Sequence, residues 1–340
     1  MLIVNIPIEP VRGRYSEDWA KWFSEELTSR KFNFITIAGP PLRTEIKDGA
    51  FLDVIATTHY KSHQVVQIAN AVDSELIPRN EKVIFLLHDG WFPVEQLAYM
   101  RDMLGCHDWK FLGIFHAGTY DRWDQTAQHG LYTWGEDIEN GWFKIYDKII
   151  VASDFHRNLL VRTRKVDHGR IKVIPWKVTV PQDLIGTAKE NWVVFPHRHD
   201  PEKMSDLFFK FHSPFEYGTY KDCLKDYSVY DTHVSPTKRR YYEMLAKSKI
   251  CLSFSLQETF GIAMVEAVLL GCIPLVPDRL SYQEMYPRCF RYKGESEFKE
   301  KLAKFCSGDV PFNQLQFLKY KFIRWAGAFF NNLEDEIHNL

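Results

Sequence analysis

Two acidic residues, Glu258 and Glu266, lie on either side of a stretch whose backbone could bind a phosphate group. Every residue from Ile262 to Leu270 except Glu266 is apolar, so the helix expected there is buried on all sides. An ionised carboxylate inside such a helix needs a ligand or a buried hydrogen-bond donor. The first N–H groups of the helix have no partner within it, and Gly261 would let a phosphate approach them closely. The spacing therefore predicts an anion site with a carboxylate on each side.

Segments of high β-propensity enclose this helix and predict a β-loop-α-β unit. Ile250 to Phe254 precedes the loop, and Ile273 to Val276 follows the helix after Gly271. Ligands bind at the carboxyl ends of the strands in such units, and the loop from Leu256 to Gly261 lies at that end. We expect a bound phosphate to contact the backbone of four consecutive residues, namely Thr259, Phe260, Gly261 and Ile262.

A second short segment supplies positive charge. It runs from Pro196 to Lys203 and follows a strand expected at Trp192 to Phe195. Asp200 can cap a helix and Pro201 suits its first position, so Lys203 would lie in the first turn. A cation there opposes the helix dipole unless an anion binds nearby. The segment therefore indicates a second contact with a phosphorylated ligand.

Glu258 and Glu266, separated by seven residues, resemble the Glu-x7-Glu signature of retaining glycosyltransferases with the GT-B fold. Four segments are also similar to the tRNA-queuosine mannosyltransferase branch of that superfamily: Tyr241 to Glu243, Gln257 to Ala267, Gly271 to Leu275 and Tyr286 to Pro287. The resemblance implies that Glu258 contacts the donor sugar and that Glu266 binds the nucleotide ribose. The amides between them would hold the donor diphosphate.

The same resemblance assigns roles to residues outside this stretch. Arg198 and Lys203 would neutralise the diphosphate, and His116 would lie near the transferred sugar. The loop that carries His233 and Val234 would read the nucleotide base through its backbone. We expect the donor to be a UDP-sugar rather than a GDP-sugar, with no further cofactor. The chain has no Asp-x-Asp motif, which predicts a reaction without a metal ion.

Strand and helix patterns alternate in the N-terminal half, which predicts a parallel sheet flanked by helices. The first strand is expected at Leu2 to Ile6, and Ser16 can cap a first helix that runs to about Arg30. The loop between them would lie at the edge where a cleft opens. Its arginines could contact the phosphates of an acceptor, or they could simply be solvated. The loop residues expected at the acceptor are Arg12, Gly13, Arg14 and Tyr15.

Two histidines, His88 and His116, each follow an apolar strand directly, so we expect both rings to face the same cleft. Gly118 and Thr119 come shortly after His116 and are expected, with His88, to contact the acceptor. The alternative for the histidines is a hydrogen-bonded structural role.

Two departures from the mannosyltransferase pattern bear on the acceptor. Those enzymes continue from the histidine with Glu-Asn-Gln where this chain has Ala117 to Thr119, and their N-terminal Gly-Gly-Ser loop reads Arg12 to Ser16 here. The N-terminal half also resembles bacteriophage glycosyltransferases that modify hydroxymethylated pyrimidines in DNA. We therefore expect a base in DNA as the acceptor, with tRNA queuosine or a small or glycan acceptor as alternatives. A basic cluster from His156 to Lys172 could follow a nucleic-acid backbone or form a solvated face.

The chain has 340 residues, 45% of them apolar, and is long enough for two packed domains. We expect the α/β GT-B fold, with two Rossmann-like domains that face a cleft. The expected divisions are an acceptor domain at 1–177, a linker at 178–191, a nucleotide-sugar domain at 192–316 and a C-terminal helix at 317–340 that returns to the first domain.

Composition argues against several classes of protein. A net charge of −1 gives no global attraction to nucleic acid, so any polyanion needs a local patch. No run of about 18 uncharged apolar residues occurs and no signal-peptide pattern begins the chain. We therefore expect a cytoplasmic protein without a membrane partner, in the host cytoplasm if a phage encodes it. Six cysteines without a Cys-x-x-Cys pair indicate neither a zinc site nor a disulfide framework.

Two functions from other classes are also compatible with these residues. A sugar-nucleotide epimerase can share the GT-B fold and needs no acceptor. A non-catalytic nucleotide-binding module would keep Arg198, Lys203 and Glu266 but would need no ordered acceptor cleft. The sequence leaves the oligomeric state open.

Overall fold

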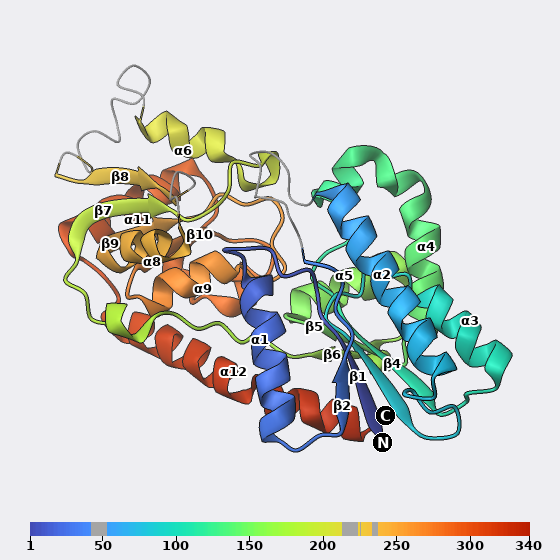
Figure 1. Ribbon diagram of the computed structural model, residues 1–340. Helices are drawn as coiled ribbons and strands as arrows, with labels where there is room; N and C mark the ends of the chain where they lie inside the picture. Colours follow the sequence, from blue (N-terminus) through green and yellow to red (C-terminus); the bar gives the residue numbers. More distant parts are fainter. Residues whose placement is uncertain (42–52, 213–223, 225, 233–236) are drawn as a thin grey trace. The chain divides into compact units, whose positions relative to one another are not determined.

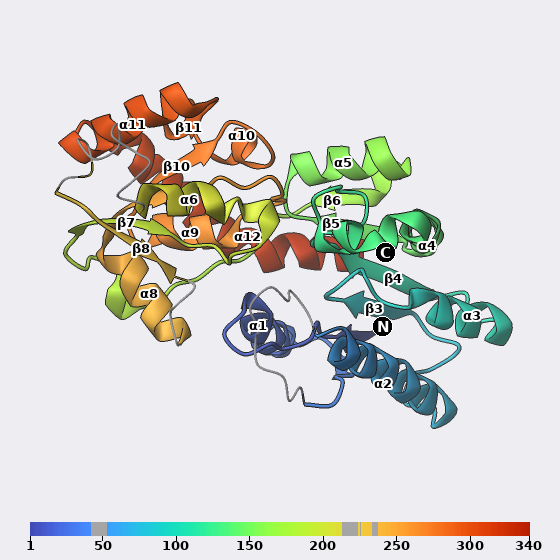
Figure 2. The same cartoon turned by 90° about the horizontal axis from the view of Figure 1, so that it is seen from above.

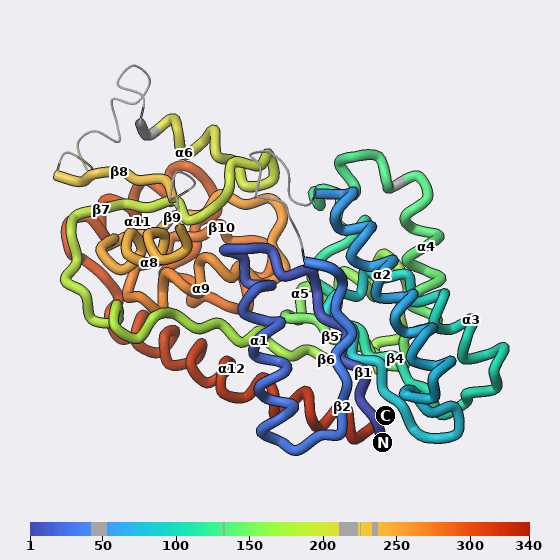
Figure 3. Tube along the Cα trace, viewed as in Figure 1, coloured from blue at the N-terminus to red at the C-terminus, as the bar shows by residue number. Residues whose placement is uncertain are grey.

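The computed structural model describes residues 1–41, 53–212, 224, 226–232 and 237–340 (Figure 1). It divides into two compact units. The N-terminal unit comprises Met1–Ala152, His156–Ile174 and Phe330–Leu340, and the C-terminal unit comprises Ser153–Phe155 and Pro175–Phe329. The chain enters the C-terminal unit after Ile174 and returns to the N-terminal unit within its last helix (Figure 3).

The N-terminal unit contains a sheet in which all described strand pairs are parallel. Its strand order is β2-β1-β3-β4-β5-β6. The strands are β1 Leu2–Ile6, β2 Phe34–Thr36, β3 Val83–Leu87, β4 Trp109–Ile114, β5 Lys148–Val151 and β6 Ile171–Val173. All positions of β1 and β3 are buried. Strands that are buried on both faces are continuous apolar segments in the sequence, and Asn5 is the one polar residue of these two strands.

Helices cover both faces of this sheet. They are α1 Tyr15–Ser29, α2 Val54–Asp73, α3 Val94–Leu104, α4 Tyr132–Ile145 and α5 Asp154–Arg164, with short turns at Ala127–Leu131 and His168–Arg170. Helix α1 and the end of the last helix lie on one face, and α2, α3 and α4 lie on the other (Figure 2). Ser16 was expected to cap the first helix, but the structure places the N-cap two residues earlier. Arg14 occupies the N-cap position, and the Ser16 hydroxyl instead accepts a hydrogen bond from the Val11 amide at 3.2 Å.

The C-terminal unit contains a second parallel sheet, with the strand order β11-β10-β9-β7-β8. Its strands are β7 Glu190–Phe195, β8 Ser228–Asp231, β9 Ser248–Leu252, β10 Ile273–Pro277 and β11 Arg291–Tyr292. Its helices are α6 Ser205–His212, α8 Lys238–Lys247, α9 Ile262–Leu269, α10 Tyr282–Met285, α11 Glu295–Ser307 and α12 Phe312–His338, with short turns at Gln182–Leu184, Pro201–Lys203 and Arg288–Phe290. Two parallel sheets of Rossmann-like type confirm the expected α/β fold class.

Lys189 joins two helices of the C-terminal unit. Its ammonium group donates hydrogen bonds to the carbonyl oxygens of Leu245 and Ala246 in α8, at 3.3 and 2.8 Å. It also donates to the Leu270 carbonyl, just beyond the end of α9, at 2.8 Å. The last carbonyls of a helix have no partner within it and carry partial negative charge, so one cation stabilises both helix ends.

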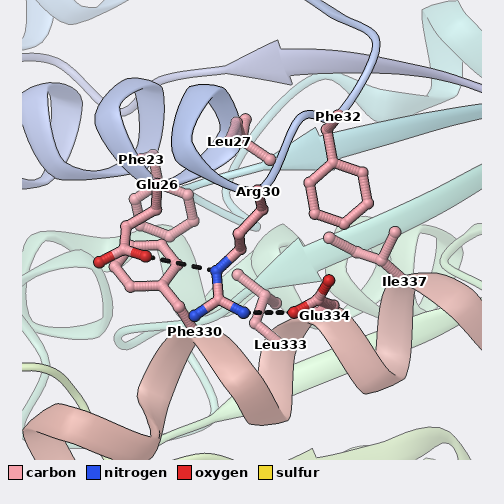
Figure 4. Close-up of a pocket in the computed structure, with 9 residues that line it drawn as sticks. All are labelled: Phe23, Glu26, Leu27, Arg30, Phe32, Phe330, Leu333, Glu334 and Ile337. Carbon is pink, nitrogen blue, oxygen red and sulfur yellow. Dashed lines mark hydrogen bonds and ion pairs between the residues drawn. The ribbon is translucent and has the colours of Figure 1, made fainter.

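Arg30, at the end of α1, joins this helix to the last part of α12 (Figure 4). Its guanidinium group donates to Asn331 Oδ1 at 2.7 Å, to Glu26 Oε2 at 3.3 Å and to the carboxylate of Glu334. Beside these polar contacts, the rings of Phe23 and Phe330 meet edge to face at 5.0 Å. The contact combines a charge-assisted network with apolar packing, so it should stabilise the N-terminal unit.

We expect Arg30→Met to lower the free energy of unfolding of the N-terminal unit by about 1–2 kcal/mol, because hydrogen bonds to charged groups are lost. Urea denaturation measures this change, and hydrogen exchange at Phe330–Leu340 should become faster. The matched control is Lys21→Met, whose partner Glu25 lies 3.7 Å away with both side chains exposed. Such surface pairs contribute roughly 0–1 kcal/mol. Equal effects of the two substitutions would contradict this account of Arg30.

Candidate functional site

The loops after β7 and β9 meet at the carboxyl edge of the C-terminal sheet, where ligands bind in open parallel sheets. Lys203, after β7, donates hydrogen bonds from Nζ to Glu258 Oε2 and to the Gln257 carbonyl, both at 2.8 Å. The Leu256 amide donates to the Glu202 carbonyl at 2.7 Å. The structure therefore brings together Lys203 and Glu258, which the sequence assigned to one site.

Lys203 has a different local setting from the one expected. It lies in the short 3-10 turn Pro201–Lys203 rather than in the first turn of an α-helix. Asp200 occupies the N-cap position, but its side chain makes no capping hydrogen bond within the described part of the chain. Lys203 is only 6% exposed, and the carboxylate of Glu258 balances its charge. The buried lysine therefore does not by itself require a bound anion.

Arg198 also lies among acids. Its Nη2 atom donates to Glu202 Oε1 at 2.6 Å, and its Nε atom forms an ion pair with the Asp200 carboxylate. Both acidic residues are buried. A diphosphate at this position would have to share Arg198 with two carboxylates, which lowers the net attraction that the sequence suggested.

The start of α9 has the geometry that the sequence predicted. Gly261 is the N-cap residue, with φ of 81°, in the left-handed region that favours glycine. A Cβ atom at this position would lie 3.1 Å from Tyr282 Cε1 and 3.3 Å from Glu258 Cγ, so there is little room for a larger residue. No side chain of the described residues caps the helix. Its first N–H groups, including that of Ile262, remain suited to an anion.

Carbonyl contacts hold the loop that precedes α9. The Ser153 hydroxyl donates to the Thr259 carbonyl at 2.6 Å, and the Ser281 hydroxyl donates to the Glu258 carbonyl at 3.1 Å. The ring of Phe260 is buried and lies 6.3 Å from that of Trp176. These contacts fix the loop through its carbonyl side and through the Phe260 ring.

Glu266 is buried within α9, and two tyrosines of α8 bind its carboxylate. The Tyr241 hydroxyl donates to Oε2 at 2.7 Å and the Tyr242 hydroxyl donates to Oε1 at 2.8 Å. Burial, followed by the nearby Glu266 carboxylate, raises the pKa of Tyr241 well above its usual value, so this phenol remains a donor. The buried donors that the apolar surroundings of Glu266 demanded are therefore present.

Two residues beside this site had no predicted role. His197 is buried, and its Nε2 atom has no hydrogen-bond partner among the described residues. Burial is the main cause that lowers the pKa of His197 well below its usual value, and the positive charges of Lys203 and Arg198 lower it further. The ring is therefore neutral. Arg279 donates to the carbonyls of Phe254 and Ser255, at 2.7 and 2.9 Å, and holds the strand end before Glu258. In the sequence, His197 could have been recognised as a site residue because it precedes Arg198. No sequence feature indicated the role of Arg279.

The residues expected at the nucleotide base, His233 and Val234, lie outside the described residues. The loop before α1 is described. Arg12 and Gly13 are exposed, and the Gly13 amide donates to Glu17 Oε2 at 2.8 Å. Arg14 is half-buried at the N-cap of α1.

His88 lies in the interior of the N-terminal unit rather than at an open edge. Its ring is fully buried, lies 3.8 Å from the ring of Phe23, and forms a hydrogen bond of 2.7 Å between Nε2 and Asn5 Oδ1. Burial, followed by the charge of His116, lowers the pKa of His88 to about 3. The expectation that both histidine rings face a cleft is therefore wrong for His88, because β3 and its neighbours bury it.

His116 is half-buried at the end of β4. Its Nε2 atom donates to the His88 carbonyl at 2.8 Å, and burial lowers the pKa of His116. Its ring lies 5.4 Å from that of Tyr15 and 5.0 Å from that of Trp19. The structure thus brings His116 and Tyr15 together at the carboxyl edge of the N-terminal sheet.

Gly118 and Thr119 belong to a buried network around Glu139. The Thr119 amide and hydroxyl donate to the Glu139 carboxylate at 2.6 and 2.8 Å, and Arg164 Nε donates to it at 2.7 Å. Burial, the largest cause, raises the pKa of Glu139. A Cβ atom at Gly118 would lie 2.5 Å from Tyr120 Cε1 and 2.6 Å from Glu139 Oε1. Close packing therefore accounts for Gly118, and the network accounts for Thr119.

Several members of the basic cluster between His156 and Lys172 have partners within the N-terminal unit. Arg164 binds Glu139, Arg170 donates to the Tyr146 carbonyl, and Lys172 lies 2.9 Å from Glu336. Ion pairs and hydrogen bonds inside the unit therefore explain part of this charge without a nucleic acid.

The described residues offer neither a metal-binding cluster nor a membrane-spanning helix. No group of three or more histidine, cysteine, aspartate or glutamate side chains is arranged to hold a metal ion. No described helix has the length and apolar character needed to cross a bilayer.

Comparison with solved structures identifies the fold. Sucrose-phosphate synthase from Thermosynechococcus elongatus superposes with a TM-score of 0.60 at 12% identity, covering 99% of this chain and 100% of that one. A UDP-forming alpha,alpha-trehalose-phosphate synthase from Burkholderia vietnamiensis gives 0.55 at 10% identity, covering 98% of both chains. WaaG, a glycosyltransferase of lipopolysaccharide biosynthesis, gives 0.54 at 10% identity, covering 99% of both. The chain has the GT-B fold.

Sequence comparison is more limited for this GT-B chain. A region of 69 residues is 36% identical to the tRNA-queuosine alpha-mannosyltransferase of Drosophila melanogaster. That region covers 20% of the present chain and 18% of the relative, so the similarity spans under one fifth of the relative's length. No family model matches the chain.

We expect Lys203→Met to destabilise the C-terminal unit of this GT-B chain by about 2 kcal/mol, because Glu258 loses the cation that compensates its partial burial. Denaturant unfolding followed by tryptophan fluorescence measures the change. Adding Glu258→Gln should restore part of the loss, since neither charge is then left unpaired.

The matched control for this experiment is Lys247→Met. Lys247 lies 3.0 Å from Glu190, but both side chains are almost half exposed, so the expected change is roughly 0–1 kcal/mol. A Lys203→Met protein as stable as the control would show that the buried pair has no structural importance.

Proposed function

We propose that this chain is a glycosyltransferase that moves a sugar from a nucleoside diphosphate sugar to an acceptor hydroxyl, with retention of anomeric configuration and without a metal ion. The observation that carries the proposal is the position of Lys203, Glu258 and the start of α9 together at the carboxyl edge of the C-terminal sheet. Enzymes named for sugar transfer share the fold, which supports the same class of reaction here.

Charge stabilisation is the main chemical task of such a site. When the bond between the anomeric carbon and the phosphate oxygen breaks, negative charge develops on the diphosphate and positive charge on the sugar ring. The amides at the start of α9 would meet the diphosphate, and Arg198 and Lys203 would add positive charge. Glu258 would accept hydrogen bonds from sugar hydroxyls. Because Lys203 binds Glu258 directly, the phosphate and sugar contacts would be positioned together.

No protein nucleophile is needed in this proposal. The acceptor oxygen forms the new bond to the anomeric carbon on the face that the diphosphate leaves. Its proton passes to the departing phosphate oxygen. His116, beside Tyr15 in the N-terminal unit, would shape the sugar site.

For the donor we propose a UDP-sugar, and the neighbour described as a UDP-forming synthase supports this choice. For the acceptor, the sequence favoured a hydroxymethylated pyrimidine in DNA. The 69-residue match to a tRNA-queuosine mannosyltransferase favours a second candidate, the queuosine base of tRNA. Both acceptors are hydroxyl groups on a modified base.

We expect Glu258→Ala to reduce kcat by about 100-fold or more, because a contact made to the reacting sugar is lost. Glu266→Ala should instead raise the KM for the donor, with a smaller effect on kcat. Steady-state kinetics of donor consumption separates the two effects. The control is Glu300→Ala, since Glu300 is exposed and pairs with Lys304 at 2.8 Å on the surface of α11. Wild-type turnover by Glu258→Ala would refute the assignment of this site.

Mass spectrometry identifies the acceptor after incubation of the protein with UDP- or GDP-sugars and either hydroxymethylated DNA or queuosine-containing tRNA. We expect a mass increase of one hexose or pentose on one of the two nucleic acids. Slow donor hydrolysis without acceptor supports a transferase. Interconversion of the donor sugar would indicate an epimerase, and donor binding without any turnover would indicate a non-catalytic module.

A further inference from the structure

Tyr241 and Tyr242 are consecutive residues of α8, and both hydroxyls bind the one carboxylate of Glu266 on α9. The two hydrogen bonds are 2.7 and 2.8 Å long and end on different carboxylate oxygens. Side chains of consecutive helical residues point about 100° apart, so they do not normally reach the same group. Here the two rings lie 5.3 Å apart and converge on Glu266.

This arrangement fixes the direction in which the carboxylate faces. One hydrogen bond would leave the group able to turn about its last bond, whereas one bond to each oxygen sets the plane of the group. An ionised carboxylate can accept about four hydrogen bonds, and the two phenols account for two of them. The surrounding helix is apolar, with Met264, Val265 and Ala267 all buried.

We propose that Tyr241 and Tyr242 are positioning residues that orient Glu266 toward the vicinal hydroxyls of a nucleotide ribose. They thereby set the preference for ribonucleotides over deoxyribonucleotides. The inference rests on the proposed function, which places a nucleoside diphosphate sugar in the C-terminal unit. A carboxylate held in one orientation presents two oxygens to two adjacent O–H donors without first losing rotational freedom.

The phenols act through Glu266, so their effect differs from that of a general loss of stability. Removing one phenolic oxygen lets the carboxylate turn. Binding of a ribonucleotide then weakens, while binding of an analogue that lacks one ribose hydroxyl changes less. The ratio of the two affinities is therefore the informative quantity, because a merely structural role would change both affinities equally.

Isothermal titration calorimetry with UDP, 2′-deoxy-UDP and 3′-deoxy-UDP tests the proposal, with GDP and its deoxy analogues titrated in parallel. For the wild type, we expect at least one deoxy analogue to bind about 10-fold to 100-fold more weakly, as for a lost hydrogen bond to a charged group. Tyr241→Phe and Tyr242→Phe should each reduce this ratio by about threefold or more, and the double variant should bring it close to one.

Tyr227→Phe is the matched control, because its hydroxyl donates to the Cys306 carbonyl at 3.1 Å rather than to Glu266. It should keep the wild-type ratio. Thermal unfolding of each variant checks that it is folded, and the half-buried Tyr241 provides a variant that tolerates substitution if Tyr242→Phe does not.

The outcomes separate the two proposals. If the wild type discriminates and both phenylalanine variants keep the full ratio, the positioning role is refuted while the proposed function stands. If the wild type binds ribonucleotide and deoxyribonucleotide equally, the positioning role is also refuted. If the wild type binds none of these diphosphates, the proposed function fails and this inference fails with it.

Discussion

The ion pair between Lys203 and Glu258 is the contact on which the C-terminal site depends. A lysine that is 6% exposed must have its charge compensated, and the compensating carboxylate comes from a loop 55 residues further along the chain. The same ammonium group also binds the Gln257 carbonyl, so it fixes both the side chain and the backbone of the loop that leads into α9. This attachment, together with the contacts of Ser153 and Ser281, holds the loop that leads to Gly261 and the start of α9. The charges that are proposed to bind the donor are thus the same charges that hold the loop in place.

The N-terminal unit also contains a buried charge that needs compensation, but here the buried group is a carboxylate. Glu139 is fully buried, and Arg164 and Thr119 compensate it through three hydrogen bonds. These bonds hold the loop after β4. The half-buried His116 lies near the start of this loop. Buried ion pairs contribute little net stability, but removing one partner is costly. Both pairs therefore fix the conformation of loops at the carboxyl edges of their sheets.

The sequence predicted the elements whose apolar pattern is unambiguous. The uninterrupted burial of β1 and β3, and the burial of α9 around Glu266, follow directly from residue type. The sequence failed where a contact depends on distant residues. It placed Lys203 in a helix because the partner Glu258 could not be inferred from local pattern. It placed His88 at an open edge because nothing local showed that Phe23 covers it. It required a partner for Glu266, yet the identity of that partner depends on how α8 packs beside α9.

The contacts of Lys189 limit how the site between the strand ends and α9 can change during evolution. Its ammonium group ties the carboxyl ends of α8 and α9, while the tyrosines tie the same two helices at Glu266. Two helices joined at two separate points resist tilting and sliding relative to each other. Under the proposed function, adaptation to a different sugar or nucleotide would then proceed by exchange of loop residues after β7 and β9, while the contacts between α8 and α9 stay unaltered.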